Sequence, residues 1–144
     1  MARFGKVDYK QLKELQKRLQ QFDELDRKKI CEDSAKELGR SLTARVKKKT
    51  PVGQYPASSG KKGGTLRRNW KTAQFSIPNG YQVDVINATK YAVYVEYGHR
   101  ARGRKKWIEG RYMLTRSENE VQANTTKTVN KHVERALRGL FDDK

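Results

Sequence analysis

The side chains that could perform acid–base or nucleophilic chemistry are few and lie far apart in the 144-residue chain. His99 and His132 are the only two histidines, and Cys31 is the only cysteine. These residues do not have the spacing of metal ligands, and a single thiol excludes an internal disulfide framework. Cys31 is predicted to be a small buried hydrophobic residue, and His132 to lie at the surface or edge of a helix. The sequence predicts no catalytic residue, no metal site and no cofactor.

Two carboxylates in the middle of the chain are the remaining candidates for chemistry. Asp84 and Glu96 could join His99 in the centre of a metal-dependent nuclease. Such centres need several converging carboxylates, and residues 71–97 contain only these two. The sequence therefore favours a protein that is not an enzyme. A metal-dependent nuclease ranks third, after the two non-enzymatic interpretations given below.

Basic residues offer a stronger signal. The chain has 33 Lys and Arg against 16 Asp and Glu, a net charge of +17, and about half of the excess lies in residues 51–70 (+4) and 98–111 (+5). Loops with such a bias in sign are usually contact surfaces for an anion or an acidic partner. The predicted contact residues are Lys61, Lys62, Arg68, Arg100, Arg102, Arg104, Lys105 and Lys106.

The composition of these basic segments leaves their partner open. The second segment includes Trp107, and cations interleaved with an aromatic residue can neutralise phosphates and stack a base. The same cations suit acidic patches on a protein, and solvated loops are a third interpretation. No zinc-finger, ribonucleoprotein or helix-turn-helix pattern accompanies them. A non-specific nucleic-acid-binding protein is therefore the main alternative to a protein that contacts other proteins.

The length predicts a single domain over residues 1–144, with basic loops at about 51–64 and 98–110. The longest uncharged apolar run, Tyr91 to Val95, is five residues, far short of the roughly 20 residues of a membrane-spanning helix. The first six residues lack the apolar core of a secretory signal, which predicts a protein that is intracellular when it is made.

Two helices are expected before the first basic loop. Asp8 can cap the first helix, whose apolar stripe has spacings of three and four: Leu12, Leu15, Leu19 and Phe22. The acidic run from Asp23 to Asp26 is predicted to end that helix and to cap a second one. Thr50-Pro51 should end the second helix, because the residue before a proline is disfavoured in the helical conformation.

A small antiparallel sheet is expected in the centre of the chain. Residues 71–77 and 81–86 flank Pro78-Asn79-Gly80, and Asn-Gly between strands is a strong hairpin signal. A short helical turn near Thr65 should place Leu66 and Trp70 on one side. A sheet of so few strands needs a packing partner, and a neighbouring subunit is one natural source of it.

The rest of the chain completes an α+β fold. Residues 91–97 suit either a strand or one to two helical turns, and the second basic loop follows them. A long helix is predicted from Tyr112 to about Leu140. The fold class is thus α+β, with two N-terminal helices, a small antiparallel sheet and a long C-terminal helix.

Four sequence blocks together resemble a known family. They are Thr50-Pro51-Val52, Gly64-Thr65-Leu66-Arg67-Arg68, the run from Tyr91 to Arg100 and Arg111-Tyr112-Met113-Leu114. In this order they resemble the neck and tail-component proteins of tailed bacteriophages, the lambdoid HK-type family, over about residues 8–140. The most specific block is Tyr-Ala-Val-Tyr-Val-Glu-Tyr-Gly-His-Arg. The family usually has Thr-Gly where this chain has Gly63-Gly64.

The resemblance implies a structural virion protein at the head–tail junction, or one that completes the tail end, made in the host cytoplasm and without a membrane partner. Such proteins form homo-oligomeric rings and contact other neck, connector or tail proteins. Non-specific contact with the phage genome is left open. The family-motif and interface candidates are Tyr91, Tyr94, Glu96, Tyr97, Gly98, Leu66 and Arg67.

Glu96 lies in the most apolar part of the chain, which leaves two interpretations of its carboxylate. It could face water at an edge. We favour a carboxylate held against a cation, either Arg67 or Arg100, because an unpaired buried charge is costly.

Overall fold

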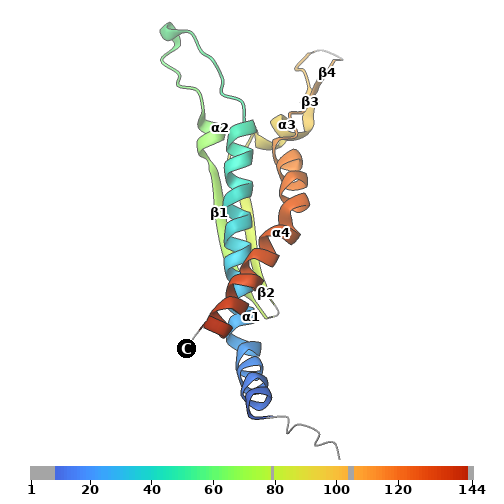
Figure 1. The fold of residues 1–144 in the computed structure, drawn as a ribbon. Coiled ribbons are helices and arrows are strands. Elements are labelled where there is room, and N and C mark those ends of the chain that lie inside the picture. Colours follow the sequence, from blue (N-terminus) through green and yellow to red (C-terminus); the bar gives the residue numbers. More distant parts are fainter. Residues whose placement is uncertain (1–8, 79, 104–105, 143–144) are drawn as a thin grey trace, which may run out of the picture.

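The computed structural model of the chain describes residues 9–78, 80–103 and 106–142, and the side chains of residues 11, 21–26 and 140–142 lie outside that description. The α+β class is confirmed (Figure 1). The elements in chain order are α1 (Lys10–Lys49), the 3₁₀ turn η1 (Ala57–Ser59), α2 (Thr65–Arg68), β1 (Trp70–Ile77), β2 (Gly80–Asn87), α3 (Ala92–Tyr97), β3 (Gly98–Arg100), β4 (Trp107–Glu109) and α4 (Met113–Asp142).

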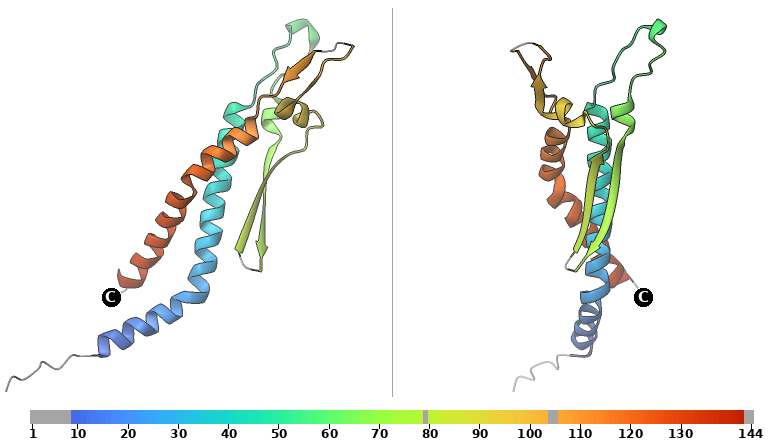
Figure 2. Two further views of the ribbon diagram at one scale, coloured as in Figure 1. Left: turned by 90° about the vertical axis from the view of Figure 1, so that its right-hand side faces the viewer. Right: turned by 180° about the vertical axis from the view of Figure 1, so that it is seen from behind.

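Helix α1 is the central element of the fold. At 1.5 Å per residue its 40 residues extend over about 60 Å. The β1–β2 hairpin lies along one side of α1, and α4 lies along another side and runs antiparallel to it (Figure 2). The molecule is therefore elongated, with α1 between two layers that do not cover each other.

The prediction of two N-terminal helices is wrong, because α1 continues through residues 23–26. No proline or glycine occurs between Lys10 and Leu38, and an Asp inside a helix costs only about 0.7 kcal/mol. The acidic run therefore does not break the helix, although the N-terminal part of α1 is bent away from the rest (Figure 2). Asp8 lies outside the described residues, and the helix begins after Tyr9, whose side chain forms no capping hydrogen bond.

The predicted β1–β2 hairpin is confirmed, with Trp70 paired to Asn87 and Ile77 to Gly80. One face of the hairpin packs on α1. The Thr43 and Thr72 hydroxyls lie 2.8 Å apart across this contact, and a Cβ atom added at Gly39 would collide with the side chain of Val83. The glycine thus allows the helix and the sheet to approach closely.

Residues 98–110 are not the simple loop that was expected. Strands β3 and β4 pair antiparallel, from Gly98 opposite Glu109 to Arg100 opposite Trp107. The ambiguous segment before them is helical, as α3. Gly98 makes the change of direction between α3 and β3 with φ of +90°, a conformation that L side chains rarely adopt.

Two projections extend from the same end of the molecule (Figure 1). We call residues 51–64 the loop arm and residues 98–110 the hairpin arm. The loop arm follows α1 and, as expected, has no regular structure except η1. The two basic segments, which are separated by 33 residues in the sequence, are thereby brought to one end.

A small hydrophobic core joins the elements at that end. Its buried members are Val46, Leu66, Trp70, Ala92 and Met113, with Val85, Val95 and Leu114 packed against it. These residues come from α1, α2, both layers and α3. The core therefore lies below the arms and holds their bases in place.

Candidate assembly surface

Thr50, from the Thr-Pro-Val block, is the centre of a buried hydrogen-bond network beneath the loop arm. Its hydroxyl donates to the Val46 carbonyl oxygen at 2.6 Å and accepts from the Trp70 indole Nε1 at 2.9 Å. The Arg67 guanidinium donates through Nε and Nη2 to the Thr50 carbonyl oxygen, at 3.1 and 2.6 Å. A cation at a helix C-terminus also complements the helix dipole. Arg67 thus stabilises the end of α1.

Glu96 is buried, as favoured, but the expected cationic partners are wrong. Its Oε2 accepts from the backbone N–H of Leu114 and its Oε1 from that of Thr115, both at 3.0 Å, while the Thr115 hydroxyl donates to Oε1 at 2.9 Å. The carboxylate therefore caps α4, where unpaired N–H groups and the helix dipole favour a negative charge. Among the described contacts, neither Arg67 nor Arg100 reaches it.

The backbone at the same place joins α3 to the start of α4. The Arg111 amide donates to the Val95 carbonyl oxygen at 2.8 Å, and the Tyr112 amide to that of Glu96 at 3.0 Å. A Cβ atom at Gly110 would collide with the Glu96 carbonyl oxygen. Gly98 is also buried against this junction. Glu96 and Gly98 therefore hold the junction together from inside, rather than from an exposed face.

The tyrosines of the motif have the opposite environment. Tyr91, Tyr94 and Tyr97 are all exposed around α3. The ring of His99 contacts that of Tyr94 edge to face, with 6.0 Å between centroids, and its Nδ1 is buried without a hydrogen-bond partner in the described structure. The motif thus divides into buried residues that build the junction and aromatic residues that face outward.

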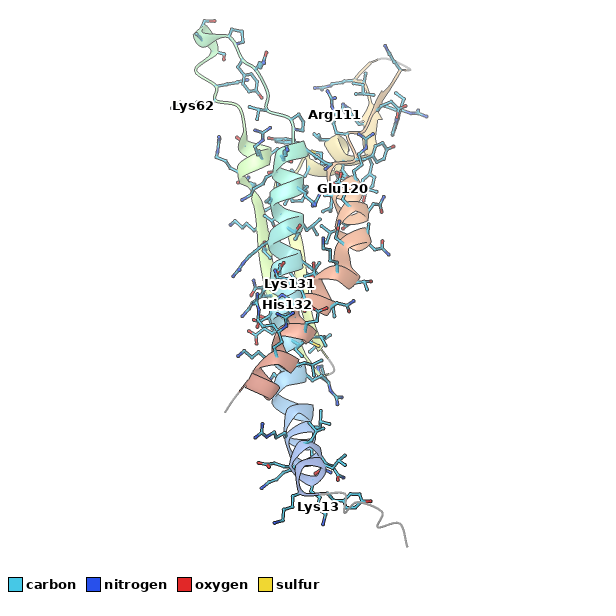
Figure 3. The ribbon with its side chains drawn as sticks, in the orientation of Figure 1. Lys13, Lys62, Arg111, Glu120, Lys131 and His132 are labelled. Carbon is cyan, nitrogen blue, oxygen red and sulfur yellow. The ribbon has the colours of Figure 1, made fainter. Side chains whose placement is uncertain are left out.

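The predicted anion-contact residues lie on or beside the arms. Lys61, Lys62, Arg100, Arg102 and Lys106 are exposed. Figure 3 shows Lys62 and Arg111 at the end that carries the arms, and Lys13 at the opposite end. Two of the predicted contact residues, Arg104 and Lys105, lie outside the described residues.

Arg68, which lies at the end of α2, is tied to the base of the loop arm. It is exposed and donates from Nη1 to the Gly63 carbonyl oxygen at 3.0 Å. At Gly63 itself a Cβ atom would collide with the backbone of Gly53. Gly63 therefore allows the two ends of the loop arm to approach each other closely.

Helices α1 and α4 are joined by ion pairs along their length, which no pattern in the sequence predicted. Glu120 lies 2.6 Å from Arg45 Nη1 and 2.8 Å from Lys49 Nζ. Glu37 lies 3.0 Å from Lys131 Nζ and 2.9 Å from His132 Nε2. Figure 3 marks Glu120, Lys131 and His132 along this contact, which we call the α1–α4 seam.

The seam has consequences for ionisation and corrects one prediction. Hydrogen bonds from Lys49 and Arg45 hold the pKa of Glu120 below its usual value, and those from Lys131 and His132 do the same for the pKa of Glu37.

His132 was expected at the surface or edge, but its pairing with Glu37 across the seam leaves it buried. Cys31 is half-buried rather than fully buried.

The described part of the chain contains no cluster of three or more His, Cys, Asp or Glu side chains that could hold a metal ion. Within the same ranges, no helix has an apolar stretch long enough to cross a membrane.

The accessible surface of the chain is large for its mass. The chain exposes 12290 Å², whereas a compact monomer of 16.7 kDa exposes about 7,600 Å².

An elongated body, a small core and two basic arms at one end describe a subunit suited to assembly with other proteins. The chain belongs to the family described as Bacteriophage HK97-gp10, putative tail-component, whose model matches residues 13–98. The match includes α1 from its fourth residue onward, the loop arm, the β1–β2 hairpin and α3, and leaves α4 and most of the hairpin arm outside. No curated protein and no solved structure matched the chain. The family makes this a structural protein of the phage tail.

Proposed function

We propose that this chain is a subunit of a ring at the head–tail joint of the phage particle, where it forms part of the neck or completes the tail end. The observation that carries this proposal is the accessible surface, about 4,700 Å² larger than that of a compact monomer of equal mass. A standard interface covers about 800 Å² on each partner. The excess therefore suits a subunit that is covered by partners on more than one side.

The arms supply the contact with neighbouring phage proteins in this proposal. A ring of subunits with a charge of +17 each would repel itself unless its cations faced anions. At physiological salt the screening length is about 8 Å, so neighbouring arms closer than this would still interact. We therefore assign the arms to acidic faces of the adjoining ring.

Assembly on a template follows from the same charge. The isolated protein should be a monomer or small oligomer at low concentration, and the connector or tail end should supply the complementary charge and register for ring closure. Light scattering at physiological salt, with and without purified tails, measures this. A stable ring without tails would overturn the requirement for a template, and phage particles that join heads to tails without this protein would overturn the function.

Contact with the genome is the second candidate function. It is favoured by Trp107, which is 49% exposed on β4 beside Lys106, because an exposed aromatic among cations can stack on a base. In this case replacing Arg100, Arg102 and Lys106 with Gln should reduce the slope of log K against log salt by about 2–3.

A matched control for that experiment replaces Lys28, Lys29 and Arg40, which are exposed cations of α1, and should have a smaller effect on the slope. If the arm variant binds DNA with an unchanged slope but fails to assemble particles, the arms contact protein. Normal DNA binding and normal assembly together would mean that the arms are solvated surface, against both candidates.

A further inference from the structure

Two apolar faces of the described chain lie away from the core and have no partner. The first is the stripe on the N-terminal part of α1, where Leu12 and Leu19 are 57% and 45% exposed. Together with Tyr9 and Leu15 they line a shallow surface depression. The N-terminal part of α1 extends beyond the hairpin turn and away from the other elements (Figure 2). We call this the helix stripe.

The second face belongs to the β1–β2 hairpin. Side chains alternate across a sheet, and the set that includes Thr72 and Val83 faces α1. The register places Phe75, Ile77 and Ile86 in the opposite set, where they are 49%, 43% and 52% exposed. We call this the open hairpin face. Exposed apolar patches of this kind mark interfaces.

Charge argues that a second copy of this chain covers these faces. The chain has a net charge of +17, but residues 9–26, which carry the helix stripe, contain four basic and four acidic residues. Residues 70–87, which form the hairpin, contain only Lys71 and Asp84 as charged residues. Both faces therefore lie in electrically balanced parts of a strongly basic molecule. Two copies can meet there without the repulsion that the arms would produce.

The shapes of the two faces argue that each one contacts the other rather than itself. One is a helical ridge and the other is the flat side of a two-stranded sheet, and helices pack on sheets in layered folds. The inner side of the hairpin is already covered by the middle of its own α1. A helix from a neighbouring copy would cover the outer side in the same way.

We propose that the helix stripe of one copy packs on the open hairpin face of the next, which gives a head-to-tail contact between subunits. Because the two surfaces differ, a pair of subunits keeps one free face of each kind, and repetition of the contact leads to a ring when the rotation closes. This inference rests on the proposed ring function and names the surfaces that would form it.

Mixing two variants tests the contact. One variant replaces Leu12 and Leu19 with Ser, and the other replaces Phe75 with Ser and Ile86 with Thr; all four positions are exposed, so both variants should fold. Sedimentation velocity of the wild type should show association that increases with concentration. Each variant alone should remain monomeric under the same conditions. An equimolar mixture should form dimers and nothing larger, because it retains one intact pair of faces.

The control is Val52→Ser, which removes an apolar side chain of similar exposure, 43%, away from both faces. It should associate like the wild type. A mixture that stays monomeric would overturn the proposal. Either variant associating normally alone would also overturn it, and would indicate contact between like faces. A wild type that is monomeric up to about 1 mM would also overturn it, since that excludes even a weak contact of about −4 kcal/mol.

The ring function has a separate readout. Incorporation of the wild-type protein into phage particles, measured by mass spectrometry of purified virions, tests the proposed function without reference to these faces. Incorporated protein with a monomeric mixture would reject the head-to-tail contact alone. A head-to-tail dimer in the mixture, with wild-type protein absent from virions, would reject the proposed function alone.

Discussion

The junction below the arms and the α1–α4 seam both join parts of the chain that are far apart in sequence, but they do so by different physics. Below the arms, Glu96 at the α3–α4 junction and Thr50 in the network beneath the loop arm are buried, and their polar atoms are paired with backbone groups and the Trp70 indole. At the seam, Glu37 and Glu120 form ion pairs with cations of the two helices, and both carboxylates are partly exposed. Buried, fully paired groups are costly to disturb, whereas exposed ion pairs contribute little each. The end that carries the arms should therefore be rigid, and the seam adjustable.

Removal of the Glu96 carboxylate should have the largest effect. Glu96→Ala leaves the first N–H groups of α4 without their acceptor and opens a cavity, which should lower the free energy of unfolding by about 2–4 kcal/mol. Glu96→Gln keeps one carbonyl acceptor and should cost less. Thermal melting measures the loss, and hydrogen exchange at the Leu114 and Thr115 amides should locate it.

A control for this experiment is Glu109→Ala, which removes an exposed carboxylate from β4 and should leave melting nearly unchanged. If Glu96→Ala melted like the wild type and the Leu114 and Thr115 amides stayed protected from exchange, the proposal that Glu96 caps α4 would be wrong. The comparison between a rigid junction and an adjustable seam would then lose its strongest support.

The contact between α1 and the hairpin should come second. Gly39→Val places a branched side chain where Val83 lies, and overpacking of this kind should lower the free energy of unfolding by about 1–3 kcal/mol. Gly139→Val is the matched control, because Gly139 also lies within a helix but its added Cβ meets open space. Equal stability of the two variants would contradict the close approach of helix and sheet. Urea unfolding is the appropriate measurement.

The junction also shows what could be predicted from the sequence and what could not. The apolar run around Glu96 favoured burial of the carboxylate over exposure at an edge, but its partner is a set of backbone N–H groups, which every residue except proline possesses. The Asn-Gly signal predicted the β1–β2 hairpin because turn chemistry is local. The prediction of a helix break at residues 23–26 was wrong because the sequence does not distinguish an acidic residue that caps a helix from one inside a helix. The distinction requires knowing where the next helix begins.

Other features depend on packing between distant segments, and composition alone does not reveal them. The arms share one end only because α1 ends and α4 begins there. Gly39 had a local signal, since an isolated glycine inside a helical pattern often has a packing reason. The hydrogen bond between Thr50 and Trp70 had no such signal, because it joins residues 20 positions apart.

Loss of the seam carboxylates should have the smallest effect, because partly exposed ion pairs contribute little each. The folded-state pKa values of Glu37 and Glu120 lie below their usual values, so their ion pairs add stability at pH values above about 4.3, the unfolded value for Glu. That contribution is lost as the pH falls from there through the depressed folded values. The double variant Glu37→Gln, Glu120→Gln should therefore melt slightly below the wild type at pH 7, and the difference should shrink as the pH falls below about 4.3.

Glu32→Gln is the matched control for the seam, because a hydrogen bond from Lys36 also lowers the pKa of Glu32 but both residues belong to α1. The loss of either kind of carboxylate should change melting with pH in the same direction. Only the seam variant should also change the distance between α1 and α4, measured by spin labels on the two helices. If acidification increased the distance between α1 and α4 as much in the seam variant as in the wild type, groups other than Glu37 and Glu120 would hold the helices together. The proposed contrast between the seam ion pairs and the buried Glu96 junction would then be wrong.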